Sequence, residues 1–198
     1  NAESLGYRIK HLGLTRRTQA GIELRVHPTL IPEKRLLANV HGVMNAVLVE
    51  GNAVGPTLYY GAGAGAEPTA SAVVADLVDI VRDMGTDQKV RMPSLAFQQD
   101  AMSDSPILPM DKVVTAFYMR MTVSEKPGAL AQITQILGDA GISIEAIRQQ
   151  THVSAQVPVI ILTRPVEEGH MNQAIRAIEA LADVNGEVAR IRVENLDG

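Results

Sequence analysis

The sequence contains no cysteine and no tryptophan, and only 3% of its 198 residues are aromatic. The lack of cysteine excludes a disulfide framework, a thiolate metal site and a cysteine nucleophile, and it suits a reducing cytoplasm. The scarcity of aromatic side chains argues against a surface that stacks nucleic-acid bases. The net charge of -4 argues against a basic surface for nucleic acid.

Long apolar runs are also missing. Hydrophobic residues make up 46% of the chain, but no run approaches the roughly 20 residues that span a bilayer. Residues 1–4 (Asn-Ala-Glu-Ser) lack the basic start and apolar stretch of a signal peptide. We therefore expect a cytoplasmic protein that interacts with neither membrane nor nucleic acid.

Residues 5–84 combine strand patterns with one long helix. Residues 21–27 alternate between apolar and polar side chains, which predicts a half-buried strand. The predicted buried face carries Ile22, Leu24 and Val26, and the predicted exposed face carries Glu23, Arg25 and His27. Pro28 and Pro32 are expected to end this strand.

Residues 43–49 are apolar on both faces, which predicts a central strand covered on two sides, with residues 54–60 as its partner. A glycine-rich turn then leads into a helix, whose first turn suits Pro68. One apolar stripe follows this helix at helical spacing. Its members are Val73, Val74, Leu77, Ile80, Val81 and Met84.

Residues 112–195 have a simpler pattern. Strands are predicted at residues 117–123, 142–147, 157–163 and 188–193. Amphipathic helices follow the first and third of them, so the order is β-α-β-β-α-β, the ferredoxin-like arrangement. The predicted fold class is α+β, with a mixed or antiparallel sheet and a long helix in the first region.

The periodicity fades over residues 86–111, which contain three prolines. We interpret this segment as a linker. The predicted domains are therefore residues 1–85, a linker at 86–111, and residues 112–198.

The turn at residues 61–65 (Gly-Ala-Gly-Ala-Gly) is the first candidate for chemistry. It joins a strand to a helix start, where backbone N–H groups can approach an anion or a cofactor. Its spacing differs from the dinucleotide-binding G-x-G-x-x-G, and no strand ending in an acidic residue follows the helix. From the residues alone, a tight turn with close packing is the main interpretation and a cofactor contact is the alternative.

The loop at residues 124–130 is the second candidate. Pro127 and Gly128 bend the chain before a helix start, whose exposed N–H groups can hold a carboxylate. Glu125 could pair with an amino group, so one loop could recognise a free amino acid. An ordinary Pro-Gly turn explains the same residues equally well.

The remaining polar residues predict no catalytic or metal site. We interpret the basic cluster of residues 8–17 as a solvated strand face. The five histidines lack metal-ligand spacing, and no G-x-S-x-G nucleophile motif is present.

Three stretches of the first region resemble homoserine dehydrogenases: residues 21–32 (GIELRVHPTLIP), 43–51 (VMNAVLVEG) and 60–74 (YGAGAGAEPTASAVV). The Glu-Pro-Thr-Ala-Ser-Ala run makes the third stretch more specific than its glycines alone. Residues 112–198 resemble the ACT domain that many bacterial members carry. The resemblance therefore extends over nearly the whole chain, which is similar to part of a catalytic domain followed by a regulatory domain.

The resemblance implies reduction of aspartate 4-semialdehyde to homoserine with NADPH or NADH, on the route to threonine, methionine and isoleucine. The family's Rossmann domain, catalytic lysine and acidic substrate-binding residues would lie upstream of Leu5. We therefore expect no catalytic residue in this chain and no activity from it alone. The resemblance further implies that Gly65, with Gly63 beside it, approaches the nicotinamide end of the cofactor.

For the ACT domain, the resemblance implies a bound regulatory amino acid, with threonine favoured. Such domains bind it across a dimer interface where two sheets join edge to edge, so a homo-oligomer is expected. The matching residues are Glu125, Pro127, Gly128 and Ala129, with Gly141 and Ile142 on the facing strand entry. Many amino-acid-binding members have Asp at the position of Glu125 and Asn at that of Ser143.

Two functions remain open at this point. The chain is either the cofactor-cleft, dimerising and regulatory part of a dehydrogenase or a non-enzymatic protein that binds amino acids. The segment at 86–111 is the expected route of coupling between the two regions.

Overall fold

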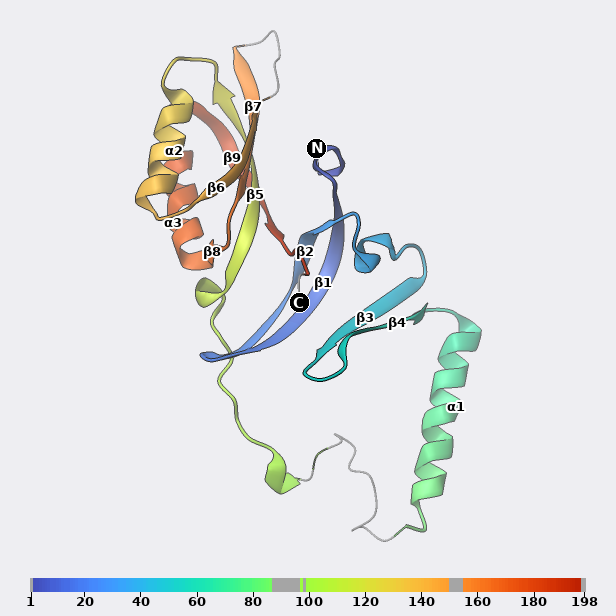
Figure 1. Ribbon diagram of the computed structural model, residues 1–198. Helices are drawn as coiled ribbons and strands as arrows, with labels where there is room; N and C mark the ends of the chain where they lie inside the picture. The colour runs from blue at the N-terminus through green and yellow to red at the C-terminus, as the bar shows by residue number, and fades with distance from the viewer. Residues whose placement is uncertain (1, 87–96, 98, 150–154, 197–198) are drawn as a thin grey trace. The chain divides into compact units, whose positions relative to one another are not determined.

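A computed structural model of the chain describes residues 2–86, 97, 99–149 and 155–196 (Figure 1). The chain divides into two compact units, one formed by Asn1–Ala38 with Pro106–Asp197 and the other mainly by Asn39–Ser105. The first unit contains β1 (Tyr7–Thr18), β2 (Gly21–Pro32), β5 (Val114–Ser124), α2 (Ala129–Asp139), β6 (Ile144–Gln149), β7 (Gln156–Thr163), β8 (Val166–Glu167), α3 (Glu168–Glu179) and β9 (Val184–Val193). The second contains β3 (Met44–Gly51), β4 (Gly55–Ala62) and α1 (Ala66–Asp83).

The first unit is built on one sheet with the strand order β1-β2-β9-β5-β7-β6, and the short β8 pairs with β5. The stretch β5-α2-β6-β7-α3-β9 has the predicted β-α-β-β-α-β order. Its strands lie in the sheet as β9-β5-β7-β6, with the first and last strands of the motif side by side. The α+β class and the ferredoxin-like region are therefore confirmed.

The main core lies between this sheet and the helices α2 and α3. Alternate residues of β5 point toward the helices, and the apolar stripes of the helices cover them. Fully buried members include Phe117, Met119, Ile133, Leu137, Met171 and Ile178. The helices α2 and α3 thus cover one face of the β9-β5-β7-β6 sheet.

The β1–β2 hairpin joins this sheet through β9. β2 pairs with β9 in parallel over only two positions, Thr29 opposite Arg192 and Leu30 opposite Val193. The sheet thus takes strands from both sides of the predicted linker, and residues 87–96 and 98 of that linker lie outside the described residues. The division of the chain into domains 1–85 and 112–198 with a linker at 86–111 stays a prediction.

The predicted burial of β2 is wrong. Glu23 and Arg25 are 3% and 4% exposed, whereas Leu24 and Val26 are 57% and 67% exposed. Alternation shows that a strand has two different faces but not which of them is covered. Here the charged face is covered, because Arg25 makes ion pairs with Glu23 and with Glu194 after β9.

β2 ends at Pro32, as predicted, but the prediction that Pro28 ends it is wrong, since the strand continues through that residue. The N–H of Ile22 and the C=O of Leu30 both bond away from β1, to Pro106 and Glu194. Peptide groups alternate along a strand, so the nitrogen of Pro28 also points away from β1. Pairing with β9 starts only at Thr29, and the missing proline N–H therefore costs neither ladder a hydrogen bond.

In the second unit, the hairpin of β3 and β4 and the helix α1 form where they were predicted, with Pro68 in the first turn of α1. The prediction of a central strand covered on two sides is wrong: β3 and β4 form a two-stranded sheet, and Val47 is 60% exposed. The apolar stripe of α1 is exposed along its whole length. No helix in the described ranges is long and apolar enough to cross a membrane.

Candidate functional sites

The glycine turn connects β4 to α1 and is exposed throughout. Gly65 is the N-cap of α1 with φ +133°, a conformation that side-chain-bearing residues rarely adopt, and its carbonyl accepts the N–H of Thr69 at 3.1 Å. A Cβ on Gly65 would also stand 3.2 Å from the ring of Pro68. The helix start is therefore presented as bare backbone.

Gly63 is required for a different reason. Its N–H donates to the carbonyl of Val43 at 3.1 Å, and a Cβ there would lie 2.6 Å from Cγ of Asn45 and overlap its amide nitrogen. The turn thus combines the close packing expected from the residues alone with an accessible backbone. This geometry lets a flat group approach the turn without meeting a side chain on Gly63 or Gly65.

The loop between β5 and α2 borders a cavity of about 280 Å³. Gly128 is the N-cap of α2 with φ +94°, and the preceding turn is closed by hydrogen bonds within residues 124–129. Three of the predicted residues line the cavity: Glu125, Pro127 and Ala129. Ser124, Lys126 and Leu130, from the same candidate loop, line it too. Sequence reasoning missed the remaining lining residues, which are Val123, Gln149, Val157 and Val159.

The cavity therefore has an apolar wall and a charged rim. Lys126 makes an ion pair with Asp183 at 3.0 Å, which places its ammonium group beside the residue that precedes β9. An α-helix N-terminus offers unpaired N–H groups to an anion, and here it lies beside Glu125. The arrangement can accommodate a small zwitterion with an apolar or short side chain.

Gly141 and Ile142 do not line this cavity. Gly141, with φ +70°, follows the C-terminal end of α2, and the N–H of Ile142 bonds to the carbonyl of Leu137 at 2.8 Å. α2 separates them from Gly128 by about 16 Å, at 1.5 Å per residue over its 11 residues. Within one copy of the chain, the structure does not bring the two predicted halves of the amino-acid site together.

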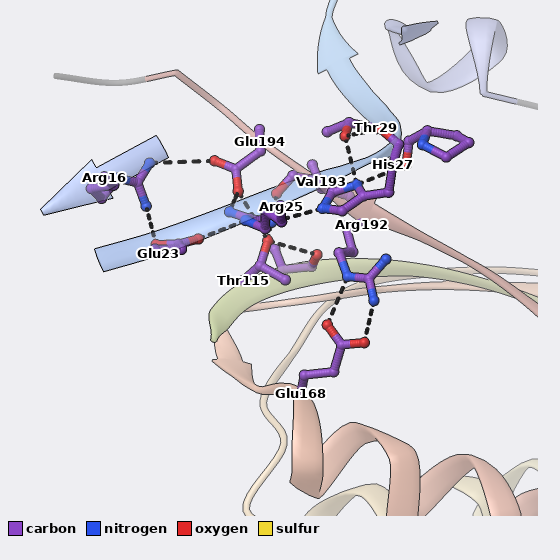
Figure 2. Close-up of polar contacts among 12 residues, drawn as sticks. Arg16, Glu23, Arg25, His27, Thr29, Thr115, Glu168, Arg192, Val193 and Glu194 are labelled. Carbon is purple, nitrogen blue, oxygen red and sulfur yellow. Dashed lines mark hydrogen bonds and ion pairs between the residues drawn. The ribbon is translucent and has the colours of Figure 1, made fainter. Parts of the chain in front are cut away.

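A buried polar cluster lies where β2 meets β9, and its residues come from both sequence regions (Figure 2). Arg25 Nε lies 2.6 Å from Glu23 Oε1, and the other end of the guanidinium donates to Glu194. Arg16 reaches both carboxylates at 3.6 Å. Thr115 Oγ1 lies 3.3 Å from Glu194 Oε1 and 3.1 Å from the carbonyl of Val193. Two carboxylates and two guanidinium groups thus neutralise one another; three of them are buried, and the side chain of Arg16 is 50% exposed.

His27 extends the cluster toward α3. Its Nε2 lies 3.2 Å from the Arg25 guanidinium and so acts as the acceptor, while Nδ1 faces the carbonyl of Pro28 at 3.2 Å. Burial lowers the pKa of His27, and the charges of Arg192 and Arg25 lower it further. The Pro28 carbonyl and Glu168 act in the opposite direction. The net effect lowers the pKa and so favours the neutral imidazole.

Arg192 and the buried Glu168 form the far end of the cluster. Arg192 Nε donates to Glu168 Oε2 at 2.7 Å, a second guanidinium nitrogen bonds to Oε1, and Arg190 lies 3.5 Å from the same carboxylate. Bidentate arginine–carboxylate pairs fix orientation as well as charge. They anchor the start of α3 to β9 beside the hairpin.

This cluster was missed from the sequence, because Glu23 and Arg25 fell on a face predicted to be exposed. No local signal could have identified the cluster, since Arg25 and Glu194 are 169 positions apart. Among the described residues, no group of three or more His, Asp or Glu could hold a metal ion. The ion pairs of the cluster connect β2, β9 and the start of α3.

Comparison with known proteins supports the family resemblance of both sequence regions. Residues 1–78 match the family model for homoserine dehydrogenase, and residues 117–183 match that for the ACT domain. Homoserine dehydrogenase from Pseudomonas aeruginosa is 59% identical over 99% of this chain and 46% of its own length. That from Neisseria gonorrhoeae is 54% identical over 98% of this chain and 45% of its own length.

Solved structures agree as well. A homoserine dehydrogenase from Thiobacillus denitrificans superposes with a TM-score of 0.92 at 61% identity, covering 99% of this chain and 44% of that one. One from S. aureus gives a TM-score of 0.59 at 26% identity, over 98% of this chain and 44% of that one. The chain therefore spans a little under half the length of the relatives it matches.

Proposed function

Because the chain belongs to the homoserine dehydrogenase family, carrying part of the catalytic region and an ACT domain, we propose that it works within an enzyme that reduces aspartate 4-semialdehyde to homoserine. The family uses NAD(P), whose reduced form supplies the hydride when bound and leaves as NAD(P)⁺. The chain contributes one wall of the cofactor cleft, contacts between subunits and a regulatory module. The observation that carries this proposal is the 59% identity over 99% of the chain to a homoserine dehydrogenase.

The glycine turn is the proposed contact with the cofactor. A side chain at Gly63 would collide with Asn45, and one at Gly65 would crowd Pro68, so both positions keep the backbone bare. Such a surface suits close approach of the flat nicotinamide end, by either NADP or NAD. The turn positions and shields this end from water and moves no proton itself. No residue of this chain has a proposed catalytic role, and we expect the chain alone to be inactive.

The proposed regulatory site is the cavity beside Glu125. The N-terminus of α2, at Gly128 and Ala129, would attract the carboxylate of a free amino acid, and Glu125 would hold its amino group. The N–H of Ala129 already donates to the carbonyl of Lys126 at 3.3 Å, so the carboxylate would be held by the neighbouring backbone N–H groups of this helix start. Threonine is the favoured ligand. Gly141 and Ile142 lie at the other end of α2, so their share in the site needs a second copy of the chain, supplied by joining ACT sheets edge to edge.

A non-enzymatic amino-acid sensor is the second candidate function. The cavity favours it as much as it favours a regulated dehydrogenase. The two functions differ in whether residues 1–78 support hydride transfer when they stand in an enzyme. Both are consistent with a cytoplasmic homo-oligomer.

A domain exchange tests the enzymatic proposal. The matching part of the Thiobacillus denitrificans protein is replaced by this chain, and NADPH oxidation by aspartate 4-semialdehyde is followed. Activity within about tenfold of the parent, a 1.4 kcal/mol effect on the barrier, supports the proposal. A folded, dimeric chimera without activity would favour the sensor alone.

Calorimetric titration of L-threonine into the chain tests the regulatory site. Saturable heat is expected, and Gly128→Asp should abolish it because the new carboxylate occupies the place of the ligand's carboxylate. Gly55→Asp is the matched control, since Gly55 has φ +73° and, like Gly128, open space around a Cβ, but lies in the β3–β4 turn. No heat with threonine, methionine or isoleucine would contradict the proposed site.

A further inference from the structure

β9 carries an ion pair just beyond each of its ends. Asp183, immediately before β9, pairs with Lys126 of the cavity loop at 3.0 Å. Glu194, immediately after β9, pairs with Arg25 and Arg16 of the β1–β2 hairpin. One strand therefore connects the loop that borders the cavity directly to the hairpin.

β5 runs beside β9 and makes the same connection in the opposite direction. Near the cavity, the N–H of Ser124 donates to the carbonyl of Asp183 at 2.8 Å. At the junction, Thr115 Oγ1 lies within hydrogen-bonding distance of both the Val193 carbonyl and Glu194. The two strands form an antiparallel ladder between these points, so the cavity loop and the junction belong to one hydrogen-bonded element.

The ladder has one irregular place. Arg120 pairs with Ala189, but Thr122 pairs with Asn185, so β9 contains extra residues opposite β5. Gly186, with φ +77°, lies in this β-bulge. Bulges bend a strand and interrupt its pairing. Pairing resumes at Ala189 and continues to Val193, so β9 is paired with β5 both near the cavity and at its far end.

The junction is sensitive to small displacements because its charges are buried. The Arg25 side chain is 1% exposed and that of Glu194 is 9% exposed. A buried charge that loses its partner is strongly unfavourable, so separation of the two is resisted and the hairpin follows Glu194. The parallel pairing of β2 and β9 is only two residues long, which leaves most of the connection to the polar cluster.

From these contacts we propose that β9 transmits occupancy of the cavity beside Glu125 to the β1–β2 hairpin, through Glu194 and its ion pairs with Arg25 and Arg16. The proposal rests on the amino-acid site proposed above. Because the hairpin lies within the segment matched by homoserine dehydrogenase, the signal enters that segment through the sheet, without following the chain through residues 86–111. The matched variant is Glu194→Gln, which keeps the shape of the side chain and removes its charge.

Amide hydrogen exchange, measured on the chain with and without L-threonine, tests this route. Threonine is expected to slow exchange in residues 29–31 at least about fivefold, the lower range of allosteric coupling. In Glu194→Gln the same heat of binding should remain, but the slowing should fall below about twofold. Lys112→Met, which breaks the exposed pair with Glu167 at 3.2 Å, is the control and should behave as the parent chain does.

Equal slowing in the parent and in Glu194→Gln, with binding intact, would overturn the relay. If Glu194→Gln does not fold, Thr115→Val takes its place, because it removes only the hydroxyl contact with Glu194 and Val193. Absence of binding heat in the parent contradicts the amino-acid site alone. The relay is then judged from Lys126→Met: faster exchange in residues 29–31 supports transmission along β9, and unchanged exchange overturns it.

Discussion

Asn45 lies across Gly63, so that its amide occupies the space where a side chain on Gly63 would stand. Both residues also approach one carbonyl, that of Val43: Gly63 donates its backbone N–H at 3.1 Å and Asn45 its side-chain amide at 3.4 Å. The turn after β4 is thereby fastened to the start of β3. The shape of the turn therefore depends on the contact of Asn45 with Gly63 as well as on the absence of a side chain at Gly63.

Gly63→Ala should therefore destabilise the second unit by about 1–3 kcal/mol, as overpacking does. Asn45→Ala should relieve most of this penalty, so the two substitutions should be strongly non-additive in urea unfolding. Gly61→Ala is the control, since a Cβ there meets nothing within 4 Å. Equal losses at Gly61 and Gly63 would contradict the steric explanation.

Local rules predicted much of this fold because local interactions decide it. Pro68 in the first turn of α1, Gly128 before α2 and the apolar stripes of α2 and α3 are all short-range features. They were enough to identify the ferredoxin-like region and the helix behind the glycine turn. The candidate cavity was partly predicted for the same reason, because Glu125, Pro127 and Ala129 are close in sequence.

The rest depended on contacts between distant residues. Which face of β2 is buried is decided by Glu194 and Thr115, and neither is visible from the alternation of residues 21–27. Because α1 and β3 have apolar faces, we predicted that other parts of the chain bury these faces. Among the described residues, both faces are exposed. Periodicity reports that an element has an apolar side; packing partners decide whether that side is covered.

Arg25→Met should cost about 3–5 kcal/mol in the free energy of unfolding, because two buried carboxylates lose their main cation. Arg82→Met serves as the control: its pair with Asp79 is exposed, and such pairs contribute little. Urea denaturation of the two variants makes the comparison. A loss at Arg25 no greater than that at Arg82 would show that Arg16 alone can neutralise Glu23 and Glu194.

His27 should make stability fall below neutral pH. Its pKa in the folded chain is lowered from 6.5, chiefly by burial, so the unfolded chain binds a proton first as pH decreases. The contribution of His27 to the free energy of unfolding should be constant above about pH 6.5, the pKa of an unfolded histidine. As the pH falls below that value, this contribution should decline until the pKa of the folded chain is reached. Below that point this residue adds no further loss.

Melting temperatures across this range, with His27→Gln beside the parent chain, measure the effect. The variant should lose the part of the slope that begins near the unfolded value. His11→Gln removes a histidine on the other face of the hairpin and should retain that slope. An identical profile for the parent and His27→Gln would mean that folding does not lower the pKa of His27.

Leu137 and Leu77 occupy similar positions in helical apolar stripes, but their environments differ. Leu137 is 0% exposed in the core of the first unit, whereas Leu77 is 56% exposed on α1. Leu137→Ala should cost about 2–5 kcal/mol, and Leu77→Ala should change stability far less. Thermal unfolding of both variants measures the two losses of stability. Comparable losses would mean that the apolar face of α1 is covered in solution.

The pairing of Arg25 with Glu194 joins residues 169 positions apart. Such distant contacts form late, because closing a long loop has an entropic cost before any contact stabilises it. During synthesis, the hairpin emerges long before β9 and carries Glu23 and Arg25 on a face that still lacks Glu194. Completion of the sheet then depends on a strand that is made long after the hairpin. Mutations or truncations near Glu194 should therefore act first on the yield of folded protein, even when the hairpin itself is intact.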